Sequence, residues 1–256
     1  MIPSPIHKVL LVMREHGVRS LLMGGQACVL YGAAEFSRDA DLVVLADMDN
    51  LRRLADAFVT LDATVEYVPP FEAQYLERGH AVHFRCARQD VRDLRVDVMA
   101  KMRGVDPFPA LWERRTTVTL GETPDRLDVD VLALTDLVKA KKTQRDKDWP
   151  MIRRLIEANY FSFREDPTAA RIDFWLRELR SPELLVECVR SFPEAAQPVG
   201  RERAAVAAAM RDEPEDIERE LQHEQDVERA NDRAYWTPLR KELERLRHAE
   251  GGHATD

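Results

Sequence analysis

Residues 21–45, LLMGGQACVLYGAAEFSRDADLVVL, contain the pattern that decides the predicted fold. The stretch predicts a strand at residues 21–23, a glycine turn at 24–25 and a helix at 26–32. A second strand is predicted from residue 39 onward. Because side chains alternate between the two faces of a strand, Asp39 and Asp41 point to the same face. The sequence therefore predicts two carboxylates in one small patch beside a glycine turn.

The Asp39–Asp41 pair and the glycine turn favour two kinds of ligand. Carboxylates at close range repel each other unless one is protonated or a cation lies between them, and hard cations such as Mg²⁺ prefer oxygen ligands. Gly24 and Gly25 let the backbone approach a ligand, and the helix that follows directs unpaired N–H groups towards an anion. A Gly-Gly pair alone also fits a plain turn. Its spacing from the Asp-x-Asp pair favours a phosphate site next to a metal site.

This pattern resembles the first motif of the nucleotidyltransferase superfamily, whose catalytic core is like that of DNA polymerase beta. The resemblance rests on two sequence stretches, Gly24-Gly25 and Ser37-Arg38-Asp39-Ala40-Asp41-Leu42-Val43. It covers roughly residues 18–160 and is closest to the small bacterial enzymes grouped with abortive-infection toxins of toxin–antitoxin pairs. The resemblance implies an α/β (α+β) fold: a mixed twisted sheet with flanking helices, followed by a helical C-terminal region.

Residues 94–100, LRVDVMA, predict a further strand with an acidic residue at its centre. A lone carboxylate such as Asp97 is costly to bury without a partner. In the resembling family the third metal-binding carboxylate occupies such a position, and the resemblance assigns that role to Asp97. The alternative is an edge-strand Asp that faces solvent.

A helix is predicted from Thr135, and its apolar stripe continues at helical spacing into charged residues, namely Lys141, Arg145 and Asp148. The family has a Lys followed by Arg-x-x-Asp that contacts the phosphates of the nucleotide. The resemblance assigns this role to Lys141, Arg145 and Asp148. Two other lysines fit the role of the first residue, Lys139 and Lys142. A purely structural network of charges along the helix is the alternative.

Two other groups of metal-ligand residue types have structural explanations. His80 and His83 are three residues apart and lie on opposite faces of a strand, so they cannot easily share an ion. Asp128 and Asp130 form a second Asp-x-Asp, but no glycine turn precedes them. They alternate with apolar residues as in a half-exposed strand. The structural interpretation is favoured, with this pair as the rival metal site.

Length and composition fit a soluble globular protein: 256 residues, 45% hydrophobic and 33% charged. From about residue 159 the chain reads as charged helices separated by Pro or Gly. We expect a catalytic domain at 1–158, a helical domain at 159–250 and a flexible tail at 251–256. No apolar run approaches the length of about 18 residues that a membrane helix needs. A cytoplasmic location without membrane partners is therefore expected.

The three cysteines, Cys28, Cys86 and Cys188, are widely spaced in apolar segments. They are expected to be reduced, buried residues rather than disulfides or a zinc site. The net charge of −8 argues against a general nucleic-acid binder, whose affinity rests on Lys and Arg. Basic residues nonetheless concentrate between 78 and 115, whereas 212–228 is mainly acidic. This is compatible with an RNA acceptor at one face, and also with an ordinary solvated surface.

The residues and the resemblance together imply a metal-dependent nucleotidyltransferase. Asp39, Asp41 and Asp97 would hold two Mg²⁺ ions, which Mn²⁺ could replace, and Asp97 would assist removal of the acceptor's proton. A hydroxyl would attack the α-phosphate of an NTP such as ATP, releasing pyrophosphate. The expected nucleotide contacts are Gly24, Gly25, Ser37, Arg38, Lys141, Arg145 and Asp148, with Lys141 also catalytic.

The expected acceptor is tRNA, which would make the protein a toxin with an antitoxin as its partner. Two alternatives stay open. One is a transferase acting on a small molecule, of the aminoglycoside-modifying kind. The other is an inactive protein that keeps the fold as a binding scaffold, since fold and function are separable.

Overall fold

The structure is a computed structural model that describes residues 4–34, 36–121 and 126–251. Contacts divide the chain into two compact units, residues 1–140 with 234–256 (unit 1) and residues 141–233 (unit 2). The predicted boundary between 158 and 159 falls within a continuous helix of unit 2. Most of the predicted tail, from residue 252 onward, lies outside the described residues. Within the described ranges, no helix is both long and apolar enough to cross a bilayer.

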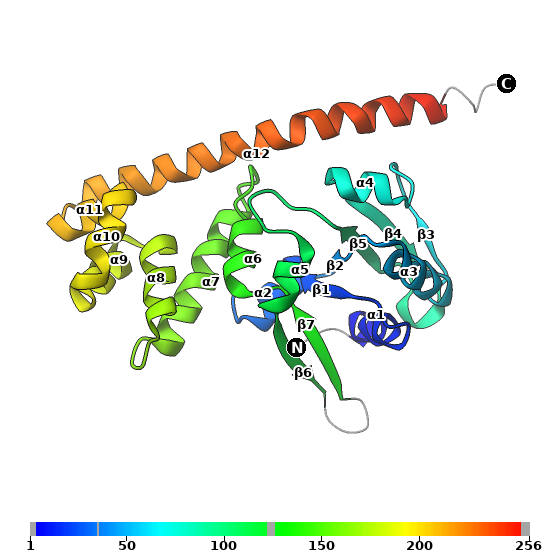
Figure 1. The fold of residues 1–256 in the computed structure, drawn as a ribbon, viewed down its shortest axis with the longest axis horizontal. Helices are drawn as coiled ribbons and strands as arrows, with labels where there is room; N and C mark the ends of the chain where they lie inside the picture. Colours follow the sequence, from blue (N-terminus) through cyan, green and yellow to red (C-terminus); the bar gives the residue numbers. More distant parts are fainter. Residues whose placement is uncertain (1–3, 35, 122–125, 252–256) are drawn as a thin grey trace. The chain divides into compact units, whose positions relative to one another are not determined.

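Unit 1 is built on a mixed sheet whose strand order is β3-β4-β5-β2-β1-β7-β6 (Figure 1). The strands are β1 (Ser20–Met23), β2 (Ala40–Val44), β3 (Ala63–Val65), β4 (Val82–Cys86), β5 (Arg95–Met99), β6 (Thr116–Leu120) and β7 (Leu127–Val131). β1 pairs antiparallel with β2 and parallel with β7, and β2 pairs parallel with β5. The other three pairings are antiparallel. The predicted mixed α/β class with a twisted sheet and flanking helices is confirmed.

Helices of unit 1 pack against this sheet and bury its apolar residues. They are α1 (Ser4–Glu15), α2 (Gly24–Leu30), α3 (Met48–Thr60), α4 (Ala73–Arg78), α5 (Phe108–Glu113), α6 (Leu134–Ala140) and a 3₁₀ turn, η1 (Gln89–Val91). α3 begins where the Asp47 side chain accepts a hydrogen bond from the N–H of Asn50 at 2.7 Å, a standard N-cap. Its Phe58 stacks on Phe84 of β4 with ring centroids 3.7 Å apart. α3 therefore covers the apolar face of β4, and the alternating residues of β4 and β5 face the other way.

Unit 2 is helical, as the sequence predicts for the C-terminal region. It contains α7 (Asp148–Phe163), α8 (Ala169–Glu178), α9 (Pro182–Ser191), α10 (Pro193–Glu202), α11 (Ala204–Arg211) and the first part of α12 (Pro214–Gly251). Its core centres on Trp175, which is fully buried and whose indole N–H donates to Asn159 Oδ1 at 2.8 Å. The ring of Tyr160 packs edge-on against it at 4.9 Å. Burial and a satisfied polar atom together anchor α7 to α8.

The continuous helix predicted from Thr135 to Asp148 is wrong. α6 ends at Ala140, residues 141–147 form turns, and α7 begins at Asp148. Pro150 lies in the first turn of α7, where a missing N–H leaves no intrahelical bond unmade. The charged residues of this segment therefore belong to a connection rather than to a helix stripe.

The last part of α12 belongs to unit 1 through a charged contact at the end of α4. Glu242 lies 2.8 Å from His80 Nε2 and 2.8 Å from Arg78 Nη2. The imidazole of His80 is 1% exposed, so its polar ring needs such a partner. The hydrogen bond with His80, helped by the charge of Arg78, lowers the pKa of Glu242.

The thiols are buried, as predicted. Cys28, Cys86 and Cys188 all lie within the described residues, and none of them forms a disulfide. Burial raises the pKa of Cys86 to about 11 and that of Cys188 to about 12. All three are core residues.

The packing of α3 predicts unequal effects of two truncations on one helix. Leu54 is fully buried, whereas Val59 is 75% exposed. Leu54→Ala is expected to lower the free energy of unfolding by about 2–5 kcal/mol because it leaves a cavity. Val59→Ala is expected to change it by less than about 0.5 kcal/mol. Urea unfolding followed by circular dichroism measures both, and equal effects would contradict the orientation of α3.

The Glu242 contact predicts a pH-dependent contribution to stability. Because its folded pKa is lowered, the contribution is present above the ordinary value of 4.5 and is lost as the pH falls through the folded pKa. Glu242→Gln is expected to lower the free energy of unfolding at neutral pH by up to about 1 kcal/mol, since solvent screens the pair. The difference from the unmodified chain should shrink as the pH falls through the folded pKa of Glu242 and vanish below it. The exposed Glu244→Gln serves as control, and a pH-independent effect of Glu242→Gln would refute this account.

Candidate functional site

The predicted carboxylates meet on one face of the sheet. Asp41 in β2 is the register partner of Asp97 in the parallel strand β5, and of Met23 at the end of β1. Side chains that lie directly opposite each other on paired strands project from the same face. Asp39 immediately precedes β2, two residues before Asp41. The structure thus brings Asp41 and Asp97 side by side, with Asp39 next to them.

The glycine turn fits closely against Asp41. Gly24 begins α2 with φ +64°, and a Cβ at this position would overlap the Asp41 carboxylate. The N–H of Gly25 points to Asp41 Oδ2 at 3.4 Å. A Cβ at Gly25 would overlap the hydroxyl of Ser37. Glycine is required at both positions because carboxylate and hydroxyl occupy the space of a side chain.

The loop that leads into β2 is held by a buried amide. Gln26 is fully buried in α2, and its Nε2 donates to the carbonyl oxygen of Ser37 at 2.7 Å. The Cys28 thiol donates to the carbonyl oxygen of Gly24 at 3.1 Å, within the same short helix. Arg38, the next residue of the loop, is exposed to solvent. The loop therefore places Ser37 against the glycine turn and leaves Arg38 at the surface.

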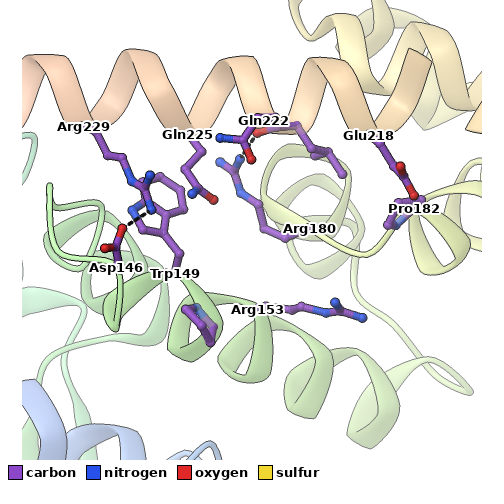
Figure 2. A pocket seen from close by; sticks show the side chains of 11 residues that line it. Asp146, Trp149, Arg153, Arg180, Pro182, Glu218, Gln222, Gln225 and Arg229 are labelled. Atoms are coloured by element: carbon purple, nitrogen blue, oxygen red, sulfur yellow. Dashed lines mark hydrogen bonds and ion pairs between the residues drawn. The ribbon is translucent and has the colours of Figure 1, made fainter. Parts of the chain in front are cut away.

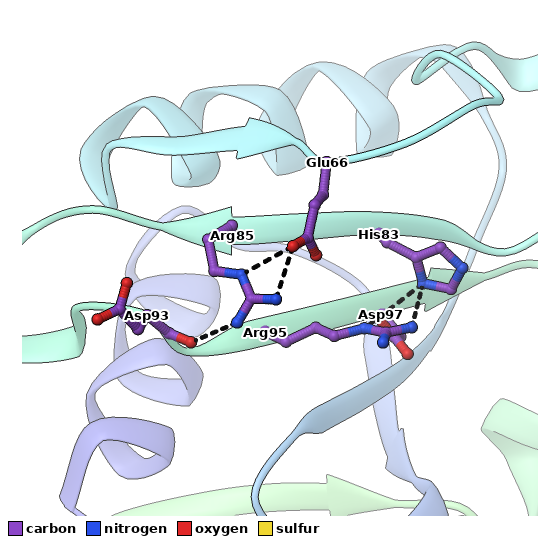
Figure 3. Close-up of polar contacts among 6 residues, drawn as sticks. All are labelled: Glu66, His83, Arg85, Asp93, Arg95 and Asp97. Carbon is purple, nitrogen blue, oxygen red and sulfur yellow. Dashed lines mark hydrogen bonds and ion pairs between the residues drawn. The ribbon is translucent and has the colours of Figure 1, made fainter.

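Two residues that the sequence analysis did not assign to the site, His83 and Arg95, contact Asp97 (Figure 3). Asp97 Oδ1 lies 2.8 Å from Nδ1 of His83 and 2.7 Å from Nε of Arg95. His83 is the register partner of Asp97 on β4. Burial opposes ionisation of Asp97, but the hydrogen bonds with His83 and Arg95 outweigh it and lower its pKa. Sequence spacing assigned His83 only a structural role, because the β4–β5 register that pairs it with Asp97 is not visible in that spacing.

The charged face continues away from Asp97 across β4. Arg85 Nη2 lies 2.7 Å from Glu66 Oε1, and Nη1 of the same guanidinium donates to the Asp93 carbonyl oxygen at 2.9 Å. Figure 3 shows these residues side by side with His83, Arg95 and Asp97. Cationic and anionic groups thus alternate along the face. The Glu66 carboxylate is paired with Arg85, and the Asp97 carboxylate with Arg95.

Carboxylate oxygens are the donors that Mg²⁺ prefers, so Asp39, Asp41 and Asp97 fit that ion by chemistry. As they stand, the described residues include no group of three or more His, Cys, Asp or Glu side chains arranged to hold a metal ion. Arg95 supplies the positive charge at Asp97. A metal ion bound to Asp97 would therefore compete with Arg95 for the charge of this carboxylate. Asp39 also acts on Arg95. The hydrogen bond with Asp97 raises the pKa of Arg95, and the charge of Asp39 raises it further.

The predicted Lys-Arg-Asp motif comes together in unit 2. Asp148 is nearly buried, with its side chain 4% exposed, and accepts from Arg145 Nε at 2.7 Å and Thr143 Oγ1 at 2.6 Å. Lys141 Nζ lies 3.5 Å from its other oxygen. Lys142 pairs instead with Glu178 at 2.8 Å. These residues converge on one carboxylate in a connection rather than along a helix, and a nucleotide contact by them stays a prediction.

The rival Asp-x-Asp pair has partners on the neighbouring strand. Thr119 Oγ1 donates to Asp128 at 2.6 Å, and Thr117 Oγ1 donates to Asp130 at 2.7 Å, each from its register partner on β6. Arg115 Nε also donates to Asp130, at 3.0 Å. Cross-strand hydrogen bonds account for both carboxylates, in line with the structural interpretation.

Comparisons with known proteins give little further guidance. No protein-family model and no curated protein sequence matches the chain. Among solved structures, one that matches is the crystal structure of an antigenic nucleotidyltransferase-like protein from Paracoccidioides brasiliensis, at 17% identity and a TM-score of 0.33. The match covers 64% of this chain and 89% of that one. At such a TM-score the likeness supports no conclusion about this protein.

The close approach of Asp41 to Gly24 predicts a difference between two glycine substitutions. Gly24 and Gly32 both have positive φ, +64° and +75°, but nothing lies within 4 Å of a Cβ built on Gly32. Gly32→Ala is expected to cost about 1 kcal/mol of unfolding free energy from backbone strain alone. Gly24→Ala is expected to cost more than about 2 kcal/mol, because Asp41 must also move.

Urea unfolding of both variants measures the difference. A loss at Gly24 no larger than that at Gly32 would show that the Asp41 carboxylate does not lie against the turn.

Proposed function

We propose that the protein is a metal-dependent nucleotidyltransferase that moves a nucleoside monophosphate from an NTP to an acceptor hydroxyl. The observation that carries the proposal is the register of β2 with β5, which pairs Asp41 with Asp97 beside the Gly24-Gly25 turn. Strand alternation and pairing thus unite carboxylates that lie 56 positions apart in the sequence. Such a cluster suits a divalent cation because its donors are all oxygen.

Each residue of the cluster has a definable role in this reaction. Asp39, Asp41 and Asp97 would hold two divalent cations, which when bound supply charge stabilisation at the α-phosphate and polarise the attacking hydroxyl. Asp97 accepts the proton of the acceptor hydroxyl. The hydroxyl oxygen forms a bond to the α-phosphorus, and the bond between that phosphorus and the pyrophosphate leaving group breaks. His83 positions the Asp97 carboxylate through the 2.8 Å contact.

The donor phosphates would be bound by groups at the turn. The N–H of Gly25, the hydroxyl of Ser37 and the exposed Arg38 are hydrogen-bond donors on adjoining segments. Arg95 has a second role, because its guanidinium is free to offset negative charge on the triphosphate once a cation neutralises Asp97. This exchange explains why an arginine pairs with a proposed metal ligand.

For the acceptor we propose tRNA, and for the biological role a toxin held in check by an antitoxin protein. The support is the sequence resemblance, together with arginines on the carboxylate face such as Arg85 and Arg95. The net charge of −8 disfavours indiscriminate nucleic-acid binding and favours one selected RNA.

The test is label transfer from each α-³²P NTP, with Mg²⁺, to total bacterial RNA and protein, followed by gel separation. Label in the tRNA band, absent with EDTA, is the expected result. Asp41→Asn is expected to lower the rate by about 100-fold or more, because metal sites are sensitive even to loss of outer partners. Asp128→Asn, from the other Asp-x-Asp pair, is the matched control and should retain full activity.

Each other outcome identifies a different function. Label in protein would move the acceptor to a polypeptide, and label only in an added aminoglycoside would favour a small-molecule transferase. No transfer to any acceptor, or equal activity of Asp41→Asn and the control, would overturn the assignment of the site.

A further inference from the structure

Unit 2 contains a pocket of about 580 Å³ that shares no residue with the carboxylate cluster (Figure 2). Its walls are one face of α7 and one face of α12, with the α8–α9 connection between them. The lining residues recur at helical spacing: 146, 149, 150 and 153 on and before α7, and 218, 221, 222, 225 and 229 on α12. The volume is within the range of about 300–1,000 Å³ typical of small-molecule sites.

Arg180 contributes a buried guanidinium group to this pocket. Its side chain is 9% exposed, and its Nε has no hydrogen-bond partner among the described residues. Glu224 is its ion-pair partner at 3.0 Å, but the same carboxylate also binds Arg203 at 2.9 Å. Two buried guanidinium groups therefore share one carboxylate.

The two arginines differ in how fully they are satisfied. Arg203 also donates to the carbonyl oxygens of Leu176 and Leu179, at 2.7 and 2.8 Å. Besides its ion pair with Glu224, Arg180 donates to the carbonyl oxygen of Leu221 at 3.5 Å, a long and therefore weak hydrogen bond. Burial and the charge of Arg203 lower the pKa of Arg180, although nearby glutamates raise it. A buried cation in this condition gains stability from a further anion.

A second guanidinium, that of Arg229, lines the same pocket from α12. Arg229 pairs with Asp146 at 2.7 Å, an aspartate whose side chain is 93% exposed, and its Nε also lacks a partner within the described residues. The centroid of the Trp149 ring lies 5.3 Å from the guanidinium carbon of Arg180 and 5.9 Å from that of Arg229. Cation–π attraction to one indole thus holds both guanidinium groups at the pocket. Figure 2 shows Arg229 and Gln225 extending from α12 towards the side chains of α7.

We propose that this pocket of unit 2 binds a small phosphorylated ligand, whose phosphate pairs with Arg180 and Arg229. Guanidinium groups match the oxygens of phosphate in both geometry and charge. The remaining volume, bordered by Trp149, Gln222 and Gln225, accommodates the rest of such a ligand with an aromatic face and two amides. The site stands independently of the proposed transferase activity, because its evidence lies wholly within residues 141–233.

The test is isothermal titration calorimetry of the intact chain with three probes: inorganic phosphate, AMP and adenosine. Phosphate and AMP are expected to bind, AMP with a dissociation constant below about 1 mM, and adenosine is expected not to bind. Tighter binding of AMP than of phosphate identifies a nucleotide as the ligand. Equal binding identifies phosphate itself as the recognised group.

Variants locate the binding. Arg229→Gln is expected to weaken binding of phosphate and AMP by about tenfold or more, through loss of a charge-assisted hydrogen bond. Its partner Asp146 is exposed, so the variant should remain folded. Arg180→Gln is expected to weaken binding at least as much, with circular dichroism as the check on folding. Arg190→Gln removes an exposed arginine of unit 2 paired with Asp212, and should bind as the unmodified chain does.

Three results would overturn the proposal. They are no binding of phosphate or AMP, adenosine binding as well as AMP, and equal affinities of Arg229→Gln and Arg190→Gln. Asp41→Asn should leave the affinities unchanged. A failed transferase assay with phosphate binding intact would separate this site from the proposed function.

Discussion

The candidate site depends on the close fit between the Asp41 carboxylate and the backbone of Gly24. No other residue type leaves room for that carboxylate at the end of β1, and the positive φ of Gly24 directs the chain from β1 into α2. The antiparallel pairing of β1 with β2 then fixes Asp41 opposite Met23, and the parallel pairing with β5 adds Asp97. The contact between Gly24 and Asp41 and the backbone pairing of β1, β2 and β5 thus together position the carboxylates.

Elements with strong local patterns could be predicted from the sequence. The strands β1 and β2, the glycine turn and the helical C-terminal region follow from side-chain alternation, helical spacing and backbone freedom, which act over a few residues. The contact of His83 with Asp97 could not, because it depends on which strands pair and in which register, here the β4–β5 ladder. Arg95 lies two residues before Asp97 on β5, so strand alternation alone places it on the same face. Spacing along the chain excludes a shared ion for His80 and His83, but it does not reveal the contact that one of them makes.

The same limit applies to residues 141–147. Helical spacing of Lys141, Arg145 and Asp148 suggested a single helix, but the turns let three donors converge on the Asp148 carboxylate. Trp149 contributes to this arrangement, since its indole N–H donates to the carbonyl oxygen of Thr143 at 2.9 Å. A buried carboxylate with several donors outweighs helix continuation, because leaving it unpaired would cost more than a few backbone bonds exposed to water.

The three native cysteines allow opening of the folded chain to be measured by chemical modification. Cys28 and Cys86 lie in unit 1 and Cys188 in unit 2, all of them buried. Alkylating reagents attack the thiolate, so modification requires opening of the surrounding core. The rate of alkylation at each position therefore measures how often its unit opens, without any introduced label. A single experiment therefore compares the opening rates of the two units, whereas a melting temperature gives one value for the whole chain.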